Sequence, residues 1–204
     1  LTYTKATYRH KYFKPLFGGR FILGLRGELG LLEAYGDTEV APFFEHYYSG
    51  GISSVRGFKQ NTLGPRAIPS QYYLDSEGNP VIGEDGNPVL NPYSYYRDDR
   101  SIGGAYLIEG GFDFIFKLPF IEDQRSMRSS FFIDIGNVFS KDCGSDQSNI
   151  NCSELDFGQL RYSFGVGVTW ITQLGPMSLA IASPSNAGPL DETENFQFEI
   201  GTQF

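Results

Sequence analysis

The sequence predicts an all-β fold, an antiparallel transmembrane β-barrel fragment of about seven strands. Apolar and polar residues alternate with a period of two. Several of these runs are at least as long as the about 9–11 residues that a membrane strand needs. Short and long connections between these runs alternate along the chain, as they do in outer-membrane barrels. Aromatic residues make up 16% of the 204 residues, and the 25 glycines accompany them. This composition favours strands over helices.

Composition also excludes several other classes of protein. The net charge of −8 argues against a nucleic-acid partner held through its phosphates. No stretch of about 18 apolar residues exists, so no transmembrane helix is expected. The alternative is a soluble β-sandwich, but soluble strands usually run about 5–6 residues, and these runs are longer. The chain begins at Leu1 without a signal-peptide pattern, and we expect a piece of a longer chain.

Seven runs carry the alternation, and each sets apolar side chains on one face and polar or small ones on the other. A long polar loop, residues 36–103, separates the second run from the third. In chain order the predicted strands are residues 2–14, 20–35, 104–117, 126–139, 160–172, 177–183 and 196–204. An even strand number closes single-chain bacterial barrels, so further strands are expected before Leu1.

The first two predicted strands, joined by a turn at residues 15–19, both have one apolar face. In the first strand Tyr8 is on the apolar face and Arg9 is on the other face. In the second, Leu25 is on the apolar face and Arg26 is on the other face. Successive side chains of a strand point to opposite faces. Each strand therefore offers one face to lipid and one to the barrel interior.

The third and fourth predicted strands each carry an acid on the face opposite their apolar residues. Phe112 and Phe114 flank Asp113, and Ile133 and Ile135 flank Asp134. Both carboxylates are therefore expected inside the barrel, where they need a cation as a partner.

The last three predicted strands repeat the pattern. The fifth alternates large residues such as Phe164 with small ones such as Gly165, and the sixth is shorter. The seventh is a terminal strand whose apolar face holds Phe196, Phe198, Ile200 and Phe204. Gly201 on its other face either allows a kink or fits a crowded neighbour.

The loop contains the stretch Val55, Arg56, Gly57 and Phe58. The simpler interpretation is that Arg56 is a surface arginine in a turn. An arginine between apolar residues instead predicts a loop that folds back and places its guanidinium against an acid. Asp113 and Asp134 are the candidate partners.

Two cysteines, Cys143 and Cys152, lie within one polar loop. With two histidines in the chain a four-ligand zinc site is improbable, so a disulfide and an oxidising compartment are predicted. In the long loop, Asp75, Glu77, Glu84 and Asp85 are either a calcium site or acidic surface turns, and the turns are the favoured interpretation. No cofactor is expected. No enzyme is expected either, because His10 faces lipid and His46 lacks a nucleophile and an acid beside it.

These residues resemble the Omp85 superfamily over nearly all of the chain, and most closely the branch that assembles outer-membrane proteins. The resemblance rests on Val55 to Phe58, on the strand pattern Phe132, Asp134 and Gly136, and on the ending Phe196 to Phe204. It is also carried by Tyr47 to Gly51, Asn61 to Pro65 and Leu174 to Pro176. TamA-like and two-partner-secretion proteins share the loop motif, so a translocation or secretion pore is the alternative.

The resemblance implies periplasmic POTRA domains followed by a barrel of sixteen strands. This chain would be the C-terminal half of that barrel. Arg56 would then lie inside the barrel against Asp134 and Asp113. The family pattern has Glu where this chain has Asp113, which suggests a water-bridged contact there. The terminal strand would close a weak seam that opens sideways and templates substrate strands.

The implied setting is the bacterial outer membrane, with the C-terminus in the periplasm. The implied partners are outer-membrane lipids, nascent β-barrel proteins and accessory lipoproteins that bind through the POTRA domains. Open strand edges also predict self-association of the fragment.

Overall fold

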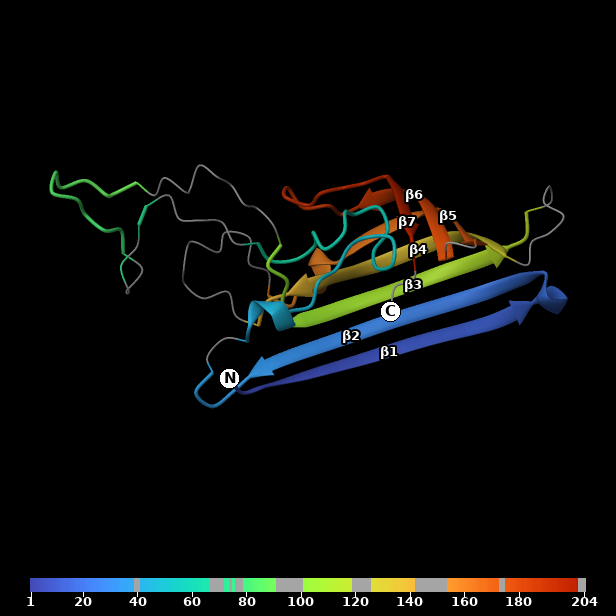
Figure 1. Ribbon diagram of the computed structural model, residues 1–204, viewed down its shortest axis with the longest axis horizontal. Coiled ribbons are helices and arrows are strands. Elements are labelled where there is room, and N and C mark those ends of the chain that lie inside the picture. The colour runs from blue at the N-terminus through green and yellow to red at the C-terminus, as the bar shows by residue number, and fades with distance from the viewer. Residues whose placement is uncertain are drawn as a thin grey trace.

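The strands of the protein form one antiparallel seven-stranded sheet in sequence order, β1 to β7 (Figure 1). The computed structural model describes residues 1–38, 41–66, 72–73, 75, 79–90, 101–118, 126–141, 154–172 and 175–201. The prediction of an all-β fold with about seven strands is confirmed. The strands are β1 (Tyr3–Leu16), β2 (Phe21–Ala34), β3 (Tyr106–Phe116), β4 (Met127–Phe139), β5 (Arg161–Thr172), β6 (Gly175–Ser185) and β7 (Phe196–Ile200).

Helical structure within the described ranges is limited to single 3-10 turns. These are η1 (Phe17–Gly19), η2 (Phe43–Glu45) and η5 (Phe157–Gln159). None of the helices in this part of the chain is long and apolar enough to cross a membrane.

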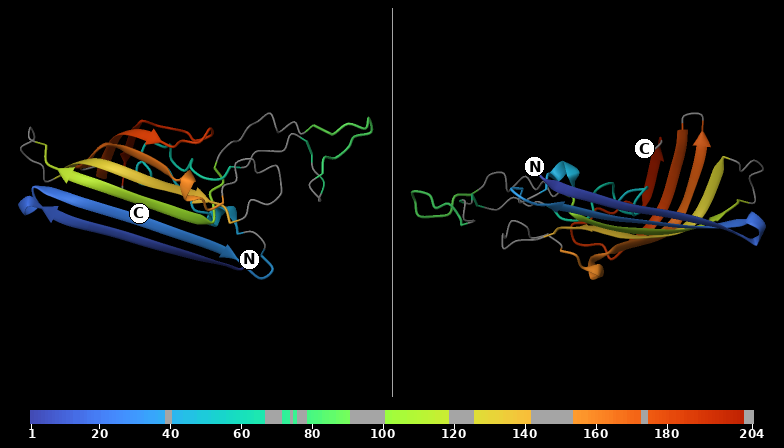
Figure 2. Two further views of the ribbon diagram at one scale, coloured as in Figure 1. Left: turned by 180° about the vertical axis from the view of Figure 1, so that it is seen from behind. Right: turned by 90° about the horizontal axis from the view of Figure 1, so that it is seen from below.

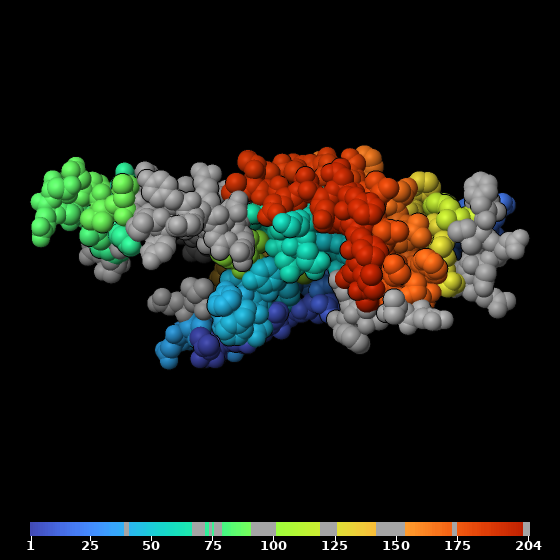
Figure 3. All heavy atoms as spheres, turned by 45° about the horizontal axis from the view of Figure 1, so that its top comes forward, coloured from blue at the N-terminus to red at the C-terminus, as the bar shows by residue number. Residues whose placement is uncertain are grey.

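The sheet curves into an open trough whose two edges are β1 and β7 (Figure 2). Part of the long connection between β2 and β3 lies in its hollow. In the space-filling view, these loop atoms sit between the N-terminal strands and β6 and β7 (Figure 3). This described part of the loop therefore covers part of the concave face of the sheet.

The convex face of the sheet is apolar and exposed. Its largest side chains include Phe131, Ile133, Phe164 and Ile181, which are 54%, 57%, 58% and 59% exposed. Each belongs to the apolar parity of its strand. A continuous apolar band of this kind is the surface that a membrane barrel presents to lipid.

The buried core lies between the loop and the sheet. One cluster joins Leu32, Leu107 and Val138 of three strands to Tyr47 of the loop. A second consists of the loop residues Val55, Phe58 and Leu63, which have almost no exposed surface. A third lies on the sheet itself, at Phe132, Ala180 and Ala182. Docking of the loop thus provides much of the apolar burial on the inner face.

β6 is longer than the expected 177–183 because it includes Pro176 and Pro184 within Gly175–Ser185. Proline cannot donate to a ladder and is confined to sheet edges. The ladder between β6 and β7 runs over Met177–Ile181 only, so both prolines lie outside it. Pro176 meets the end of β7 through its carbonyl oxygen, which accepts Gly201 N–H at 2.9 Å and needs no proline donor. Similarly, β1 continues through Pro15 to Leu16, since β1 is an edge strand.

Candidate functional site

Three glycines shape the loop tip around Arg56. Gly50, Gly51 and Gly57 have φ angles of 100°, 107° and 90°, a region that side chains rarely adopt. A Cβ at Gly57 would also lie 3.0 Å from the Cβ of Ala182 in β6. The backbone therefore passes close to the sheet here, with Val55 and Phe58 fully buried on either side of the arginine.

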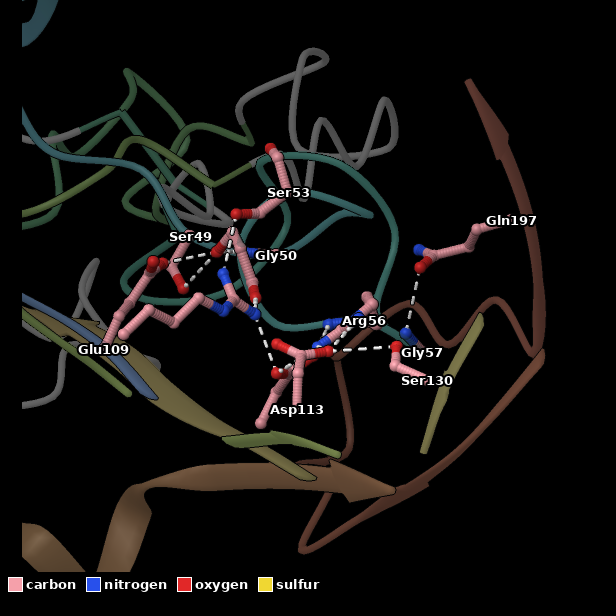
Figure 4. Close-up of polar contacts among 12 residues, drawn as sticks. Ser49, Gly50, Ser53, Arg56, Gly57, Glu109, Asp113, Ser130 and Gln197 are labelled. Atoms are coloured by element: carbon pink, nitrogen blue, oxygen red, sulfur yellow. Dashed lines mark hydrogen bonds and ion pairs between the residues drawn. The ribbon is translucent and has the colours of Figure 1, made fainter. Parts of the chain in front are cut away.

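Arg56 binds both acids predicted on the inner face. Its Nε and Nη2 donate to the two Asp134 oxygens at 2.6 and 2.8 Å, a bidentate contact. Its backbone N–H also donates to Asp134, at 3.2 Å. Nη1 and Nη2 both donate to Asp113 Oδ1 at 3.1 Å, so this contact is direct rather than bridged by water (Figure 4).

The surroundings of the guanidinium favour its charge. It lies over the Phe132 ring, 3.6 Å from the centroid, in a cation–π contact. The Arg56 side chain is 12% exposed and Asp134 is fully buried. Burial lowers the pKa of Arg56, but the hydrogen bonds and charges of Asp134 and Asp113 outweigh it, and the net pKa is raised.

A second arginine, Arg26 of β2, shares Asp134 with Arg56. Its Nη2 donates to Asp134 Oδ1 at 2.7 Å. It also donates to the carbonyl oxygens of Ser53, at 2.8 Å, and Ser54. Arg26 thus ties the sheet to the loop backbone just before Arg56.

The strand register explains how Arg26 reaches Asp134. Arg26 pairs with Gly111, and Gly111 pairs with Asp134 on the next strand. A Cβ at Gly111 would lie 2.3 Å from the Arg26 Nε. The glycine between them therefore leaves the path that the arginine side chain follows.

Two inner-face residues hold the acids and the loop in place. Ser130 donates to Asp113 at 3.2 Å. Glu109 of β3 accepts a hydrogen bond from Ser54, which in turn accepts the backbone N–H of Gly50 at 2.9 Å. Gly136 of β4 lies beneath Val55, where the sheet carries no side chain.

The terminal-strand residues divide between the two faces. Phe196, Phe198 and Ile200 are exposed on the convex face. Gly201 has a φ of 125°, and a Cβ there would meet nothing within 4 Å, so conformation rather than crowding accounts for glycine. Phe204 lies outside the described residues. Gln197 is buried on the concave face against the loop.

Arg26 and Gln197 are the main contacts that sequence reasoning missed. Both residues occupy the polar face of their strands in the alternating pattern. This position was the only signal in the sequence that they face inward. Cys143 and Cys152 lie outside the described residues, as does Glu77 of the alternative calcium site. Within the described ranges, no group of three or more histidine, cysteine or acidic residues could hold a metal ion.

Membrane-length strands, an apolar convex face and an arginine loop bound to inner-wall acids define a class of protein, the outer-membrane barrels with a loop in the lumen. Comparison with known proteins narrows the class, because a model of the Omp85 superfamily domain matches residues 1–204. The chain belongs to the Omp85 superfamily. These are non-enzymatic assembly and transport proteins, so the chain is not an enzyme.

Two relatives show which branch is similar. The chain is 34% identical to the outer membrane protein assembly factor BamA of Neisseria meningitidis serogroup B, over 100% of this chain and 24% of that protein. It therefore spans about a quarter of this relative. The crystal structure of BamA from Haemophilus ducreyi lacking POTRA domains 1-3 matches 96% of this chain and 34% of its own, with 29% identity and a TM-score of 0.74.

Proposed function

We propose that the chain is part of the machinery that folds and inserts β-barrel proteins into the bacterial outer membrane. It acts without chemistry, through a lateral seam at β7 and by templating substrate strands on an open strand edge. The similarity to an assembly factor over the whole chain supports this role.

The docked Arg56 loop carries the proposal. The loop binds inner-face acids on β3 and β4 and fills the hollow of the sheet (Figure 3). A loop held in this way braces the wall and obstructs a lumen. The barrel then serves as a scaffold rather than as a conduit.

The terminal strand supplies the edge. β7 has five residues and is hydrogen-bonded to β6 on one side only, within the described sheet. An edge strand offers unpaired main-chain groups to which another strand can add. Gly201 supports a bend at its end, since its positive φ favours glycine.

The setting of the chain follows from the same proposal. The exposed convex face would contact outer-membrane lipids, and the C-terminus would lie in the periplasm. The complete barrel would have sixteen strands, with POTRA domains that recruit accessory lipoproteins. Nascent β-barrel proteins are the substrates.

A translocation or secretion pore of the TamA-like or two-partner-secretion type is the second candidate. Shared use of the loop motif in these proteins favours it. A pore would conduct ions in planar bilayers and serve few substrates, whereas an assembly factor would serve many and conduct poorly.

The test is complementation in cells depleted of the full-length protein. Arg56→Ala is expected to lower the level of several folded outer-membrane proteins, and Arg56→Lys to restore part of it, because lysine lacks the planar fork of donors. Arg9→Ala is the matched control, since the Arg9 side chain is 71% exposed and its ion pair with Glu28, at 2.9 Å, is of the exposed kind that stabilises little. Full growth and normal barrel levels with correctly inserted Arg56→Ala protein would contradict the proposal.

A further inference from the structure

The loop that carries Arg56 also pairs with the segment that precedes the terminal strand. Glu194 N–H donates to Gly57 O at 2.8 Å, and Lys59 N–H donates to Glu192 O at 2.9 Å. Phe58 and Thr193 form the antiparallel bridge between these bonds. Residues 57–59 thus pair through an isolated bridge with residues 192–194, the segment that leads into β7.

Gln197 of β7 adds two hydrogen bonds to the same loop segment. Its side-chain oxygen accepts the Gly57 N–H at 3.1 Å (Figure 4). Its side-chain nitrogen donates to Phe58 O at 2.7 Å. The residue is 4% exposed. A primary amide offers a donor and an acceptor together, so Gln197 satisfies two main-chain groups that the loop would otherwise bury unpaired.

The surrounding charges contribute less to this link. Lys59 and Glu192 form an ion pair at 2.7 Å, with side chains 58% and 41% exposed. Exposed pairs of this kind stabilise little. The buried amide and the two main-chain bonds therefore carry the connection.

We propose that Gln197 is a positioning residue that couples the lumen loop to the terminal strand. β7 cannot move away from the concave face without breaking the hydrogen bonds to residues 57–59. The loop cannot leave the hollow without releasing β7. Under the proposed function, on which this consequence rests, undocking of the loop and opening of the seam are one event.

The chemistry of the contact suits this role. Gln197 reaches the loop with its side chain on the inner face, whereas strand addition uses main-chain groups in the plane of the sheet. The Gln197 contact therefore leaves the free-edge groups of β7 unused, whereas the two main-chain bonds use groups of Glu192 and Glu194, before β7 begins.

Hydrogen exchange of the full-length protein in nanodiscs, followed by mass spectrometry, tests the coupling. Gln197→Met keeps the length of the side chain and removes the amide. It is expected to speed exchange of residues 57–59 and 192–201 about fivefold or more, the factor for losing one or two ordinary hydrogen bonds. Residues 127–139 of β4 should not change. Gln197→Glu keeps the acceptor for Gly57 N–H but sets a buried carboxylate against Phe58 O and the Glu194 carboxylate, so it should speed exchange at least as much as Gln197→Met.

Gln60→Met is the matched control, because Gln60 is an exposed glutamine of the same loop. Equal acceleration by the control, uniform acceleration that includes residues 127–139, or no change at 192–201 would each overturn the coupling.

A second variant approaches the link from the loop. Arg56→Ala should release the loop and speed exchange at residues 192–201, although Arg56 does not contact β7 in the contacts described above. Unchanged exchange at 192–201, with faster exchange at 57–59, would overturn the coupling. Both hydrogen-exchange experiments measure local opening and not assembly activity. A failure of the proposed function would therefore appear separately, in the complementation test.

Discussion

Gly136 of β4 lies directly beneath Val55 of the loop. A Cβ at residue 136 would be 2.9 Å from Val55 Cγ2 and 2.8 Å from the carbonyl oxygen of Ile108. Val55 has no exposed surface. The loop therefore docks onto bare backbone, and only glycine allows this approach.

Gly136→Ala is expected to destabilise the docked loop. The added methyl group meets backbone on one side, which cannot shift easily, so the cost should be about 1–3 kcal/mol. Thermal unfolding in detergent measures it. Gly27→Ala is the control, because its Cβ would find its nearest neighbour at 3.8 Å. Equal melting temperatures for Gly136→Ala and the parent protein would contradict this interpretation.

Loss of Asp134 should cost more than loss of Arg56. Asp134→Asn weakens the contacts of two arginines, whereas Arg56→Ala leaves Asp134 with Arg26. Breaking a buried pair costs about 3–5 kcal/mol, and the second arginine should place Arg56→Ala at or below that range. Unfolding of both single variants and the double variant gives the coupling energy, which should make the double loss less than additive. Strict additivity would argue against a direct interaction.

Arg26→Met should loosen the loop just before Arg56. The variant removes the donors to Ser53 O, Ser54 O and Asp134, and hydrogen bonds to charged groups contribute about 1.5–3 kcal/mol each. Limited proteolysis is expected to cut within residues 50–54 of the variant faster. Arg9→Met provides the control on the neighbouring strand. Parent-like resistance in Arg26→Met would show that the loop is held without Arg26.

Strand parity was sufficient to predict which face each acid occupies. Asp113 and Asp134 each have apolar neighbours in the chain, whose side chains point to the other face of the strand. In the structure both acids lie on the inner face and contact Arg56. Parity identifies a face but not the neighbour across strands. That Arg26 aligns with Gly111 and Asp134 depends on register, which the separate strand patterns do not contain.

The contact of Gln197 with Gly57 was beyond prediction for a related reason. It joins residues 140 positions apart, and one of them lies in an irregular loop whose path depends on three glycines with positive φ. Sequence indicated only that Gln197 faces inward. The extension of β6 through Pro176 and Pro184 was also missed, because local proline rules cannot tell where the neighbouring strand β7 ends.

Cys143 and Cys152 are expected to form a disulfide within their loop, which lies outside the described residues. The bond would close a short loop and stabilise the protein by about 2–3 kcal/mol. Alkylation of the unreduced, denatured protein followed by mass spectrometry should label neither cysteine, and reduction should expose both. Labelling of both cysteines without reductant would contradict the disulfide.

The isolated chain is expected to associate through its strand edges. β1 and β7 are the two ends of the described sheet and do not pair with each other. Unpaired main-chain groups in an apolar environment cost several kcal/mol each, so a second copy that pairs with an edge should be strongly favoured. Light scattering corrected for detergent should therefore give a mass above that of one chain.

Substituting proline for Thr7 and Arg9 on the edge strand β1 should reduce that mass, since proline removes ladder donors. The same pair at exposed loop positions Glu84 and Asn87 is the control and should leave the mass unchanged. A monodisperse single chain at all concentrations would show that the edges are satisfied without a second copy.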